Sequence, residues 1–195
     1  SRLLWAGALF SWNEIRQKQI EFGITDGLVF VDAGFDSREV YQQCARHGHV
    51  EILRGREYWI CWNALFGRST QREFTYKDRK GKTYKLPYSW PPSYGDPLLG
   101  TSDAGCAQRC PVYFWAKLTI LDIAARIRDG RAAPRSLPDN AAFTEEYSRQ
   151  QFSERRQRFW DKATGQEQWK WVRIGKRPNH YWDTFCMQVV AACMA

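Results

Sequence analysis

The feature that most constrains the fold of this chain is the stretch Leu28-Val29-Phe30-Val31-Asp32-Ala33-Gly34-Phe35-Asp36. Its apolar run, from Leu28 to Val31, is rich in β-branched and aromatic residues. Such a run predicts a strand that is buried on both faces, in the centre of a sheet. Asp32 ends the strand, where ligands gather in α/β sheets. Because a buried carboxylate is costly unless a metal ion, a cation or hydrogen bonds satisfy it, we expect Asp32 to have one of these partners.

The segments around this strand predict an alternation of strands and helices. Residues 2–10 are expected to form a strand, and capping patterns at 11–14 and 36–39 predict two helices. Val50 and Ile52 then alternate as in a strand. This order is typical of an α/β fold.

The rest of the chain is less regular. Residues 56–111 resemble an insertion, which contains a predicted hairpin at 72–86. The later elements expected are a strand at Pro111–Trp115, a helix at Lys117–Asp129, a short helix at Phe143–Phe152, a hairpin at 153–174 and a final helix from about Asn179. We expect residues 1–195 to form a single domain.

The charge and the aromatic content favour an anionic partner. The net charge is +8, and the 195 residues include 10 Trp, 9 Tyr and 11 Phe. Aromatic side chains beside basic ones suit stacking on nucleic acid, although a basic protein without that role stays an alternative. Any single cation is best explained as solvated surface, but several together are expected to contact phosphate. The candidates are Arg54, Arg56, Lys117, Lys170, Arg173, Lys176 and Arg177.

The six cysteines are scattered, which favours reduced thiols over a disulfide framework. Cys106 and Cys110 lack a second pair at zinc spacing, so no zinc site is expected. No apolar run is long enough to span a bilayer. These patterns together predict a cytoplasmic protein.

The final helix carries a second acid. Cys186, Met187 and Val190 follow Asp183 at helical spacing, which places Asp183 on the apolar face, and His180 lies one turn earlier. A capping or helix-dipole role would also explain Asp183. Together with Asp32, however, it favours a site for Mg²⁺ or Mn²⁺, which prefer carboxylate oxygens. Two such ions support phosphodiester hydrolysis, and we expect the two carboxylates to converge on them.

Four segments of the chain resemble one known family. Ser1–Gly7, Val29–Gly34, Arg38–Tyr41 and Asn179–Asp183 are similar to the C-terminal nuclease region of tailed-phage terminase large subunits. The resemblance implies an RNase H-like fold and metal-dependent cutting of concatemeric double-stranded DNA in the cytoplasm of a bacterial host. It also implies an ATPase motor domain, a small terminase subunit and a portal as partners.

On that resemblance, Asp32 matches the second acid of the nuclease site and Asp183 matches the last. Asp36 and His180 are additional candidates for metal ligands, although the capping pattern already explains Asp36. Residues 2–10 look like the third strand of the fold, so its first strand and first acid are expected upstream of Ser1. We therefore expect this chain alone to bind one ion weakly and to cut DNA poorly.

Two other functions remain as alternatives. The chain could be a non-catalytic relative that binds DNA or docks on a packaging partner. An actin-like or sugar-kinase ATPase also places Asp-x-Gly after a central strand, but a second phosphate loop of this kind is not evident. Lys82-Thr83 follows Gly81 as in a Walker A loop, yet the first glycine of that motif is replaced by Tyr76. No ATPase domain is therefore expected in this chain.

Overall fold

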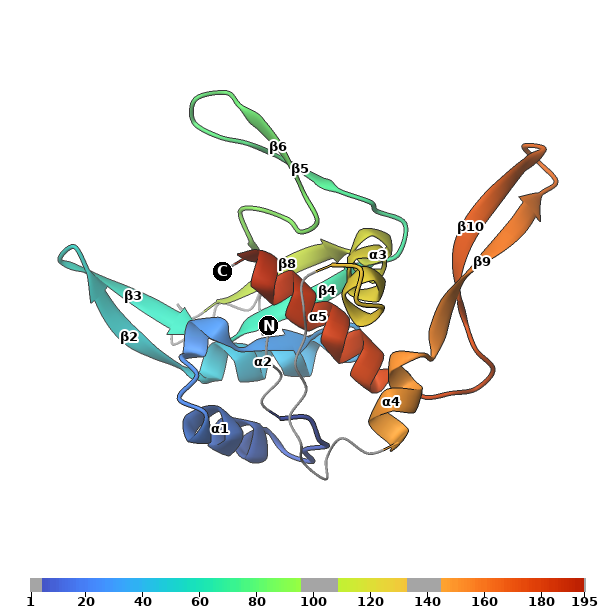
Figure 1. The fold of residues 1–195 in the computed structure, drawn as a ribbon. Coiled ribbons are helices and arrows are strands. Elements are labelled where there is room, and N and C mark those ends of the chain that lie inside the picture. The colour runs from blue at the N-terminus through green and yellow to red at the C-terminus, as the bar shows by residue number, and fades with distance from the viewer. Residues whose placement is uncertain (1–4, 96–108, 133–144, 195) are drawn as a thin grey trace. The chain divides into compact units, whose positions relative to one another are not determined.

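Four strands form a mixed sheet, in the order β1 (Phe30–Asp32), β4 (Asn63–Arg68), β8 (Cys110–Ala116) and β7 (Ser93–Gly95) (Figure 1). The first three strands are parallel, and β7 is antiparallel to β8. Helices flank this sheet, which confirms a mixed α/β fold. The structure is a computed structural model that describes residues 5–95, 109–132 and 145–194.

The chain forms two compact units, and each is discontinuous in sequence. One contains residues 1–8 and 121–189, and the other contains residues 9–120 and 190–195. The four-stranded sheet belongs to the second unit. The expectation of a single domain stays a prediction.

Strand β1 lies at an edge of the described sheet, so its predicted central position is wrong. It pairs only with β4 within that sheet, and β4 and β8 occupy the centre. Leu28, which we assigned to the strand, lies in a 3-10 turn, η1 (Asp26–Leu28), and is 57% exposed. In contrast, Leu65 in β4 is completely buried. The apolar run thus lies partly in a turn and partly in a short strand. A continuous apolar run of this length therefore did not indicate a buried strand.

Helices α1 (Trp12–Glu21) and α2 (Ser37–Arg46) begin where the capping patterns predicted. The Ser11 side chain accepts the Glu14 backbone N–H at 3.2 Å. Helix α2 contacts β1, β4 and β8, and buries Val40 and Cys44 in the core of the second unit. A capped helix is thereby fixed against all three parallel strands.

The strand predicted at residues 2–10 is absent from the described part, residues 5–10. Residues 1–4 lie outside the described residues. Trp5 to Ala8 instead line a cleft beside α4 (Glu145–Gln151) and α5 (His180–Met194). These residues therefore face helices across a cleft and do not pair in a sheet.

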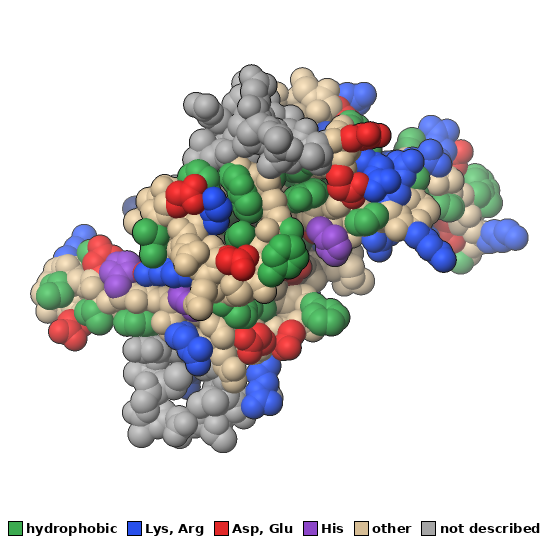
Figure 2. All heavy atoms as spheres, turned by 90° about the horizontal axis from the view of Figure 1, so that it is seen from below, with side chains coloured by type: hydrophobic (Ala, Val, Ile, Leu, Met, Phe, Trp, Pro, Cys, Tyr) green, Lys and Arg blue, Asp and Glu red, His purple; other side chains and the backbone are tan. Residues whose placement is uncertain are grey.

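Three separate hairpins complete the described strands. These are β2 (Gly48–Leu53) with β3 (Arg56–Cys61), β5 (Phe74–Lys77) with β6 (Thr83–Leu86), and β9 (Glu154–Asp161) with β10 (Gln166–Arg173). The last two are confirmed predictions. In the first hairpin, the strand around Val50 and Ile52 was predicted and β2 confirms it, whereas its pairing with β3 was not predicted. The extension at the right of Figure 2, formed by β9 and β10, carries blue basic and green apolar side chains together.

The helices of the second half agree with their predicted positions. Helix α3 covers Lys117–Arg128, and α4 and α5 follow; Phe143, where the short helix was expected to begin, lies outside the described residues. In the first unit, Trp182 is completely buried, and the Arg128 guanidinium lies 4.9 Å from its ring centre. This aromatic core fixes the start of α5, where Asp183 lies.

Candidate functional site

Asp32 is the last residue of β1, and its side chain is exposed. The prediction that its carboxylate is buried is therefore wrong. Its Oδ1 accepts the backbone N–H of Gly34 at 2.9 Å, which forms a tight turn. The next residue, Ala33, is buried and donates its N–H to the Leu65 carbonyl at 2.8 Å. Because water solvates Asp32, the carboxylate needs no buried partner, and it is accessible to a ligand.

Asp36 caps the following helix. Its Oδ1 accepts the Glu39 backbone N–H at 3.1 Å at the start of α2. This is the N-cap arrangement that the sequence pattern predicted. The contact explains the presence of an acid at this position without a metal.

Two basic residues lie where the neighbouring parallel strands end. Arg68 is the last residue of β4, and Lys117 directly follows β8. The Arg68 guanidinium lies 4.3 Å from the ring centre of Phe114 and 5.1 Å from that of Phe66. Because parallel strands end at the same edge of a sheet, this edge carries Asp32 together with both cations. Arg68 was not predicted as a site residue, although it follows a short apolar run.

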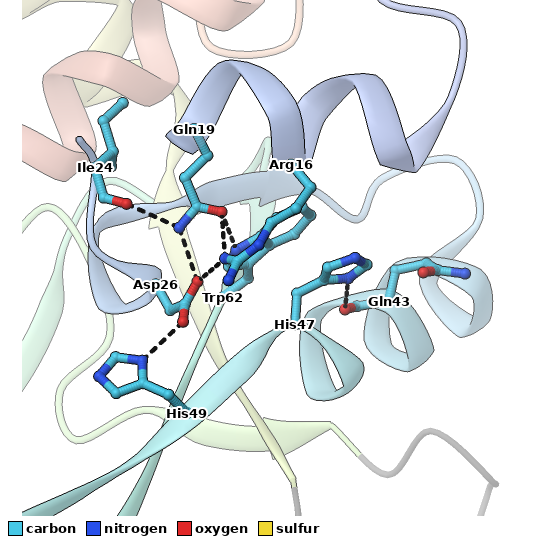
Figure 3. Close-up of polar contacts among 8 residues, drawn as sticks. All are labelled: Arg16, Gln19, Ile24, Asp26, Gln43, His47, His49 and Trp62. Atoms are coloured by element: carbon cyan, nitrogen blue, oxygen red, sulfur yellow. Dashed lines mark hydrogen bonds and ion pairs between the residues drawn. The ribbon is translucent and has the colours of Figure 1, made fainter. Parts of the chain in front are cut away.

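A buried polar cluster supports the entry into β1 (Figure 3). Asp26 has a side chain only 5% exposed and forms an ion pair with Arg16. It also accepts hydrogen bonds from Gln19 Nε2 and lies 2.7 Å from His49 Nδ1. Gln19 in turn accepts the Trp62 indole N–H at 2.9 Å. The cluster joins α1, η1, β2 and the residue that precedes β4.

The electrostatics of this cluster are dominated by hydrogen bonding. Burial alone would raise the pKa of Asp26, but hydrogen bonds from Gln19, His49 and Arg16 outweigh it and lower the pKa to about 2. Asp26 is therefore ionised at neutral pH. One weak signal in the sequence marks this cluster: Gln19 occupies the apolar stripe of α1, four residues after Ile15.

In the first unit, Asp183 lies in the first turn of α5 and is half-buried. It shares a helix side with the buried Cys186 and Val190, as its spacing predicted. The Asn179 side-chain amide donates to Asp183 Oδ2 at 2.8 Å and to Glu154 Oε1 at 3.1 Å. The Nδ2 atom of Asn179 therefore donates to the carboxylates of both Asp183 and Glu154. Glu154, at the start of β9, was missed because no local pattern marks it.

His180 begins α5 and lines a cleft of about 490 Å³. Nearby, the Tyr181 backbone N–H donates to Gln150 Oε1 at 3.0 Å, which satisfies one donor of the helix start. The cleft is lined by Trp5, Tyr147, Gln150, His180, Thr184 and Gln188, among others. His180 is exposed, so it is accessible to a ligand in this cleft.

The predicted phosphate contacts are distributed over both units. Arg54 and Arg56 lie at the turn of the β2–β3 hairpin, and Lys117 starts α3. Lys170 and Arg173 lie on β10. Lys176 and Arg177 follow β10, and the Arg177 carbonyl accepts the Arg173 Nε–H at 2.8 Å. All except the half-buried Lys117 are exposed.

Asp32 belongs to the second unit and Asp183 to the first, so their convergence stays a prediction. Among the described residues, no three His, Cys, Asp or Glu side chains form a group that could hold a metal ion. Within residues 5–95, 109–132 and 145–194, no helix is both long and apolar enough to cross a membrane. No protein-family model, curated protein or solved structure matches this chain.

Proposed function

We propose that this chain is the metal-dependent endonuclease domain of a phage terminase large subunit, with an RNase H-like fold, and that it cuts concatemeric double-stranded DNA. One observation carries the proposal: Asp32 is an exposed acid at the sheet edge where Arg68 and Lys117 also lie. An acid at the same sheet edge as two cations suits a phosphodiester and its metal ion. The terminal motif with Asp183 is the second support.

The donor chemistry of the two acids suits hard divalent cations. Asp32 and Asp183 would supply carboxylate oxygens to Mg²⁺ or Mn²⁺. His180 is a candidate additional ligand, whereas Asp36 is already engaged as the cap of α2. When bound, a pair of such ions activates water and stabilises the leaving oxygen in phosphodiester hydrolysis.

The chain's own residues have positioning roles in this proposal. Arg68 is held by Phe66 and Phe114, so its charge has a defined place for a phosphate oxygen. Asn179 orients the Asp183 carboxylate by donating a hydrogen bond to it. As a phage packaging nuclease, the protein would act in the bacterial cytoplasm with an ATPase motor, a small terminase subunit and a portal.

A plasmid-nicking assay with Mg²⁺ or Mn²⁺ tests the proposal. We expect weak metal-dependent nicking by this chain, which Asp32→Asn and Asp183→Asn each abolish, while affinity for duplex DNA changes little because phosphate contacts come from other residues. Glu51→Gln, which removes an exposed acid from β2, serves as the matched control and should keep wild-type nicking. Unchanged nicking in Asp32→Asn would refute the assignment of the site.

The alternative is a non-catalytic DNA-binding or partner-docking module derived from the same fold. The net charge of +8 and the exposed basic side chains of β10 favour DNA binding by themselves, without any cutting. In the same assay this alternative predicts salt-sensitive DNA binding and no nicking with either metal ion.

A further inference from the structure

The β9–β10 hairpin exposes an alternating basic and aromatic face that the proposed cutting chemistry does not use. Its strands form a separate two-stranded sheet, with Trp169 directly opposite Arg158 and Trp171 opposite Arg156. Trp160 lies opposite Glu167, further toward the turn. Cross-strand partners share one face of a sheet, so these side chains line the same surface.

The base of this face is anchored in the first unit. The Trp171 indole N–H donates to Asp122 Oδ1 at 2.9 Å, and its ring centre lies 6.2 Å from that of the buried Trp182. Arg156 lies 3.7 Å from the same Asp122 carboxylate. These contacts position the hairpin on α3 and α5, so its outer half extends from a fixed base.

The outer half combines exposed rings with arginines. Trp160 is 64% exposed and Trp169 is 50% exposed. The guanidinium carbons of Arg156 and Arg158 lie 5.4 and 5.1 Å from the Trp169 ring centre. Arg158 also pairs with Glu167 at 3.2 Å, but both side chains are more than half exposed, so a phosphate can replace this weak ion pair.

The net positive charge of the hairpin favours an anionic partner. Residues 154–173 contain six Lys or Arg against three Asp or Glu. Exposed indole rings interleaved with arginines suit bases that stack and phosphates that pair, which is how proteins bind unpaired nucleic-acid strands. Inside a duplex, the bases are already stacked on one another and their faces are covered, so this surface would have only phosphates to contact.

We propose that the β9–β10 hairpin binds single-stranded DNA by stacking unpaired bases on Trp160 and Trp169, with Arg156 and Arg158 pairing the flanking phosphates. The choice of DNA over RNA rests on the proposed function, whereas the stacking surface does not. At a cut or melted site, the hairpin would retain a strand that has left the duplex.

The test is fluorescence anisotropy with short labelled strands in EDTA, so that the result does not depend on metal-dependent cutting. The probes are oligo(dT), an abasic strand of equal length and charge, oligo(rU) and poly-glutamate. We expect oligo(dT) to bind at least about fivefold more tightly than the abasic strand, the gain from one stacked base. Trp160→Ala should reduce this difference, and Trp160→Ala combined with Trp169→Ala should remove it, without changing the dependence of affinity on salt, because an indole ring displaces no counterions.

Two controls separate stacking from loss of structure. Tyr58→Ala removes an aromatic side chain that is 45% exposed on the β2–β3 hairpin, and should leave oligo(dT) affinity unchanged. Arg156→Lys with Arg158→Lys keeps both charges, and should preserve the salt dependence while weakening binding. Equal affinity for oligo(dT) and the abasic strand would overturn the proposal, as would tighter binding of oligo(rU) or equal competition by poly-glutamate.

Discussion

Removing the charge of Asp26 should destabilise the second unit by about 2 kcal/mol. The variant Asp26→Asn keeps the shape of the side chain but loses the ion pair with Arg16 and the charge-assisted contacts with Gln19 and His49. The native pKa of Asp26 is about 2, compared with its ordinary 3.8. Since one pKa unit corresponds to about 1.36 kcal/mol, the ionised state contributes about 2 kcal/mol to folding at neutral pH.

A larger loss, of about 3–5 kcal/mol, is typical when one member of a buried ion pair is removed. The lower figure is expected here because the partners reach water: the Arg16 side chain is 34% exposed and that of His49 is 48% exposed. Neither partner is therefore trapped in the core when the carboxylate is neutralised. The indole of Trp62 keeps its own acceptor, because it bonds to Gln19 rather than to Asp26.

The pH dependence gives a second, independent signature of the same group. A carboxyl whose folded pKa is depressed stabilises the protein above its unfolded pKa, and this contribution is lost as the pH falls through the folded pKa. Asp26 should therefore give the wild-type protein a loss of stability between about pH 4 and pH 2. Asp26→Asn should lack this part of the loss, so the two stability curves approach each other in acid.

Urea unfolding followed by tryptophan fluorescence, at pH 7 and in steps down to pH 2, measures both effects. Glu21→Gln is the matched control, because it removes an exposed carboxylate whose pairing with Lys18 at 2.7 Å is worth under about 0.5 kcal/mol. A loss below about 0.5 kcal/mol for Asp26→Asn at pH 7, or parallel curves down to pH 2, would refute the reasoning.

Three further experiments have defined expected outcomes. Asp36→Ala should lower the free energy of unfolding by about 1 kcal/mol through loss of the α2 cap, while Asp36→Ser should restore most of it in thermal melts. Gly48→Ala should destabilise the β2–β3 hairpin, because the added Cβ would lie 2.5 Å from the Ile60 carbonyl oxygen; faster amide exchange in β3 than in the wild type would show this. In thiol labelling of the native protein at pH 8, the exposed Cys193 should react well before the buried Cys61, whose pKa is raised to about 11 by burial and the Asp26 charge; equal rates would contradict this.

The features predicted correctly are those whose causes are local in sequence. Ser11 and Asp36 each lie three residues before the backbone N–H that they accept, so a short pattern contains the whole interaction. The turns of two hairpins are likewise marked by Gly81 and Gly165, which both have positive φ. Asp183 could be placed on the apolar side of its helix because helical spacing alone decides it.

The features that were missed depend on distant partners. Strand β4 (Asn63–Arg68) is central because β1 and β8 both pair with it. No pattern within its own six residues predicts this position in the sheet. The exposure of Asp32 follows from the same topology, since the strand before it lies at an edge. Asp26 and His49 are 23 residues apart and meet only once β2 has folded beside η1.

The double contact of Asn179 makes the first unit sensitive to chemical ageing. Hydrolysis of its side-chain amide, the common slow reaction of asparagine, would replace a donor shared by Glu154 and Asp183 with a third carboxylate. Like charges at this spacing repel, so one of the three groups would take up a proton or turn away. Stored protein would then come to contain a fraction with a different charge at the start of α5, produced without any change in its gene.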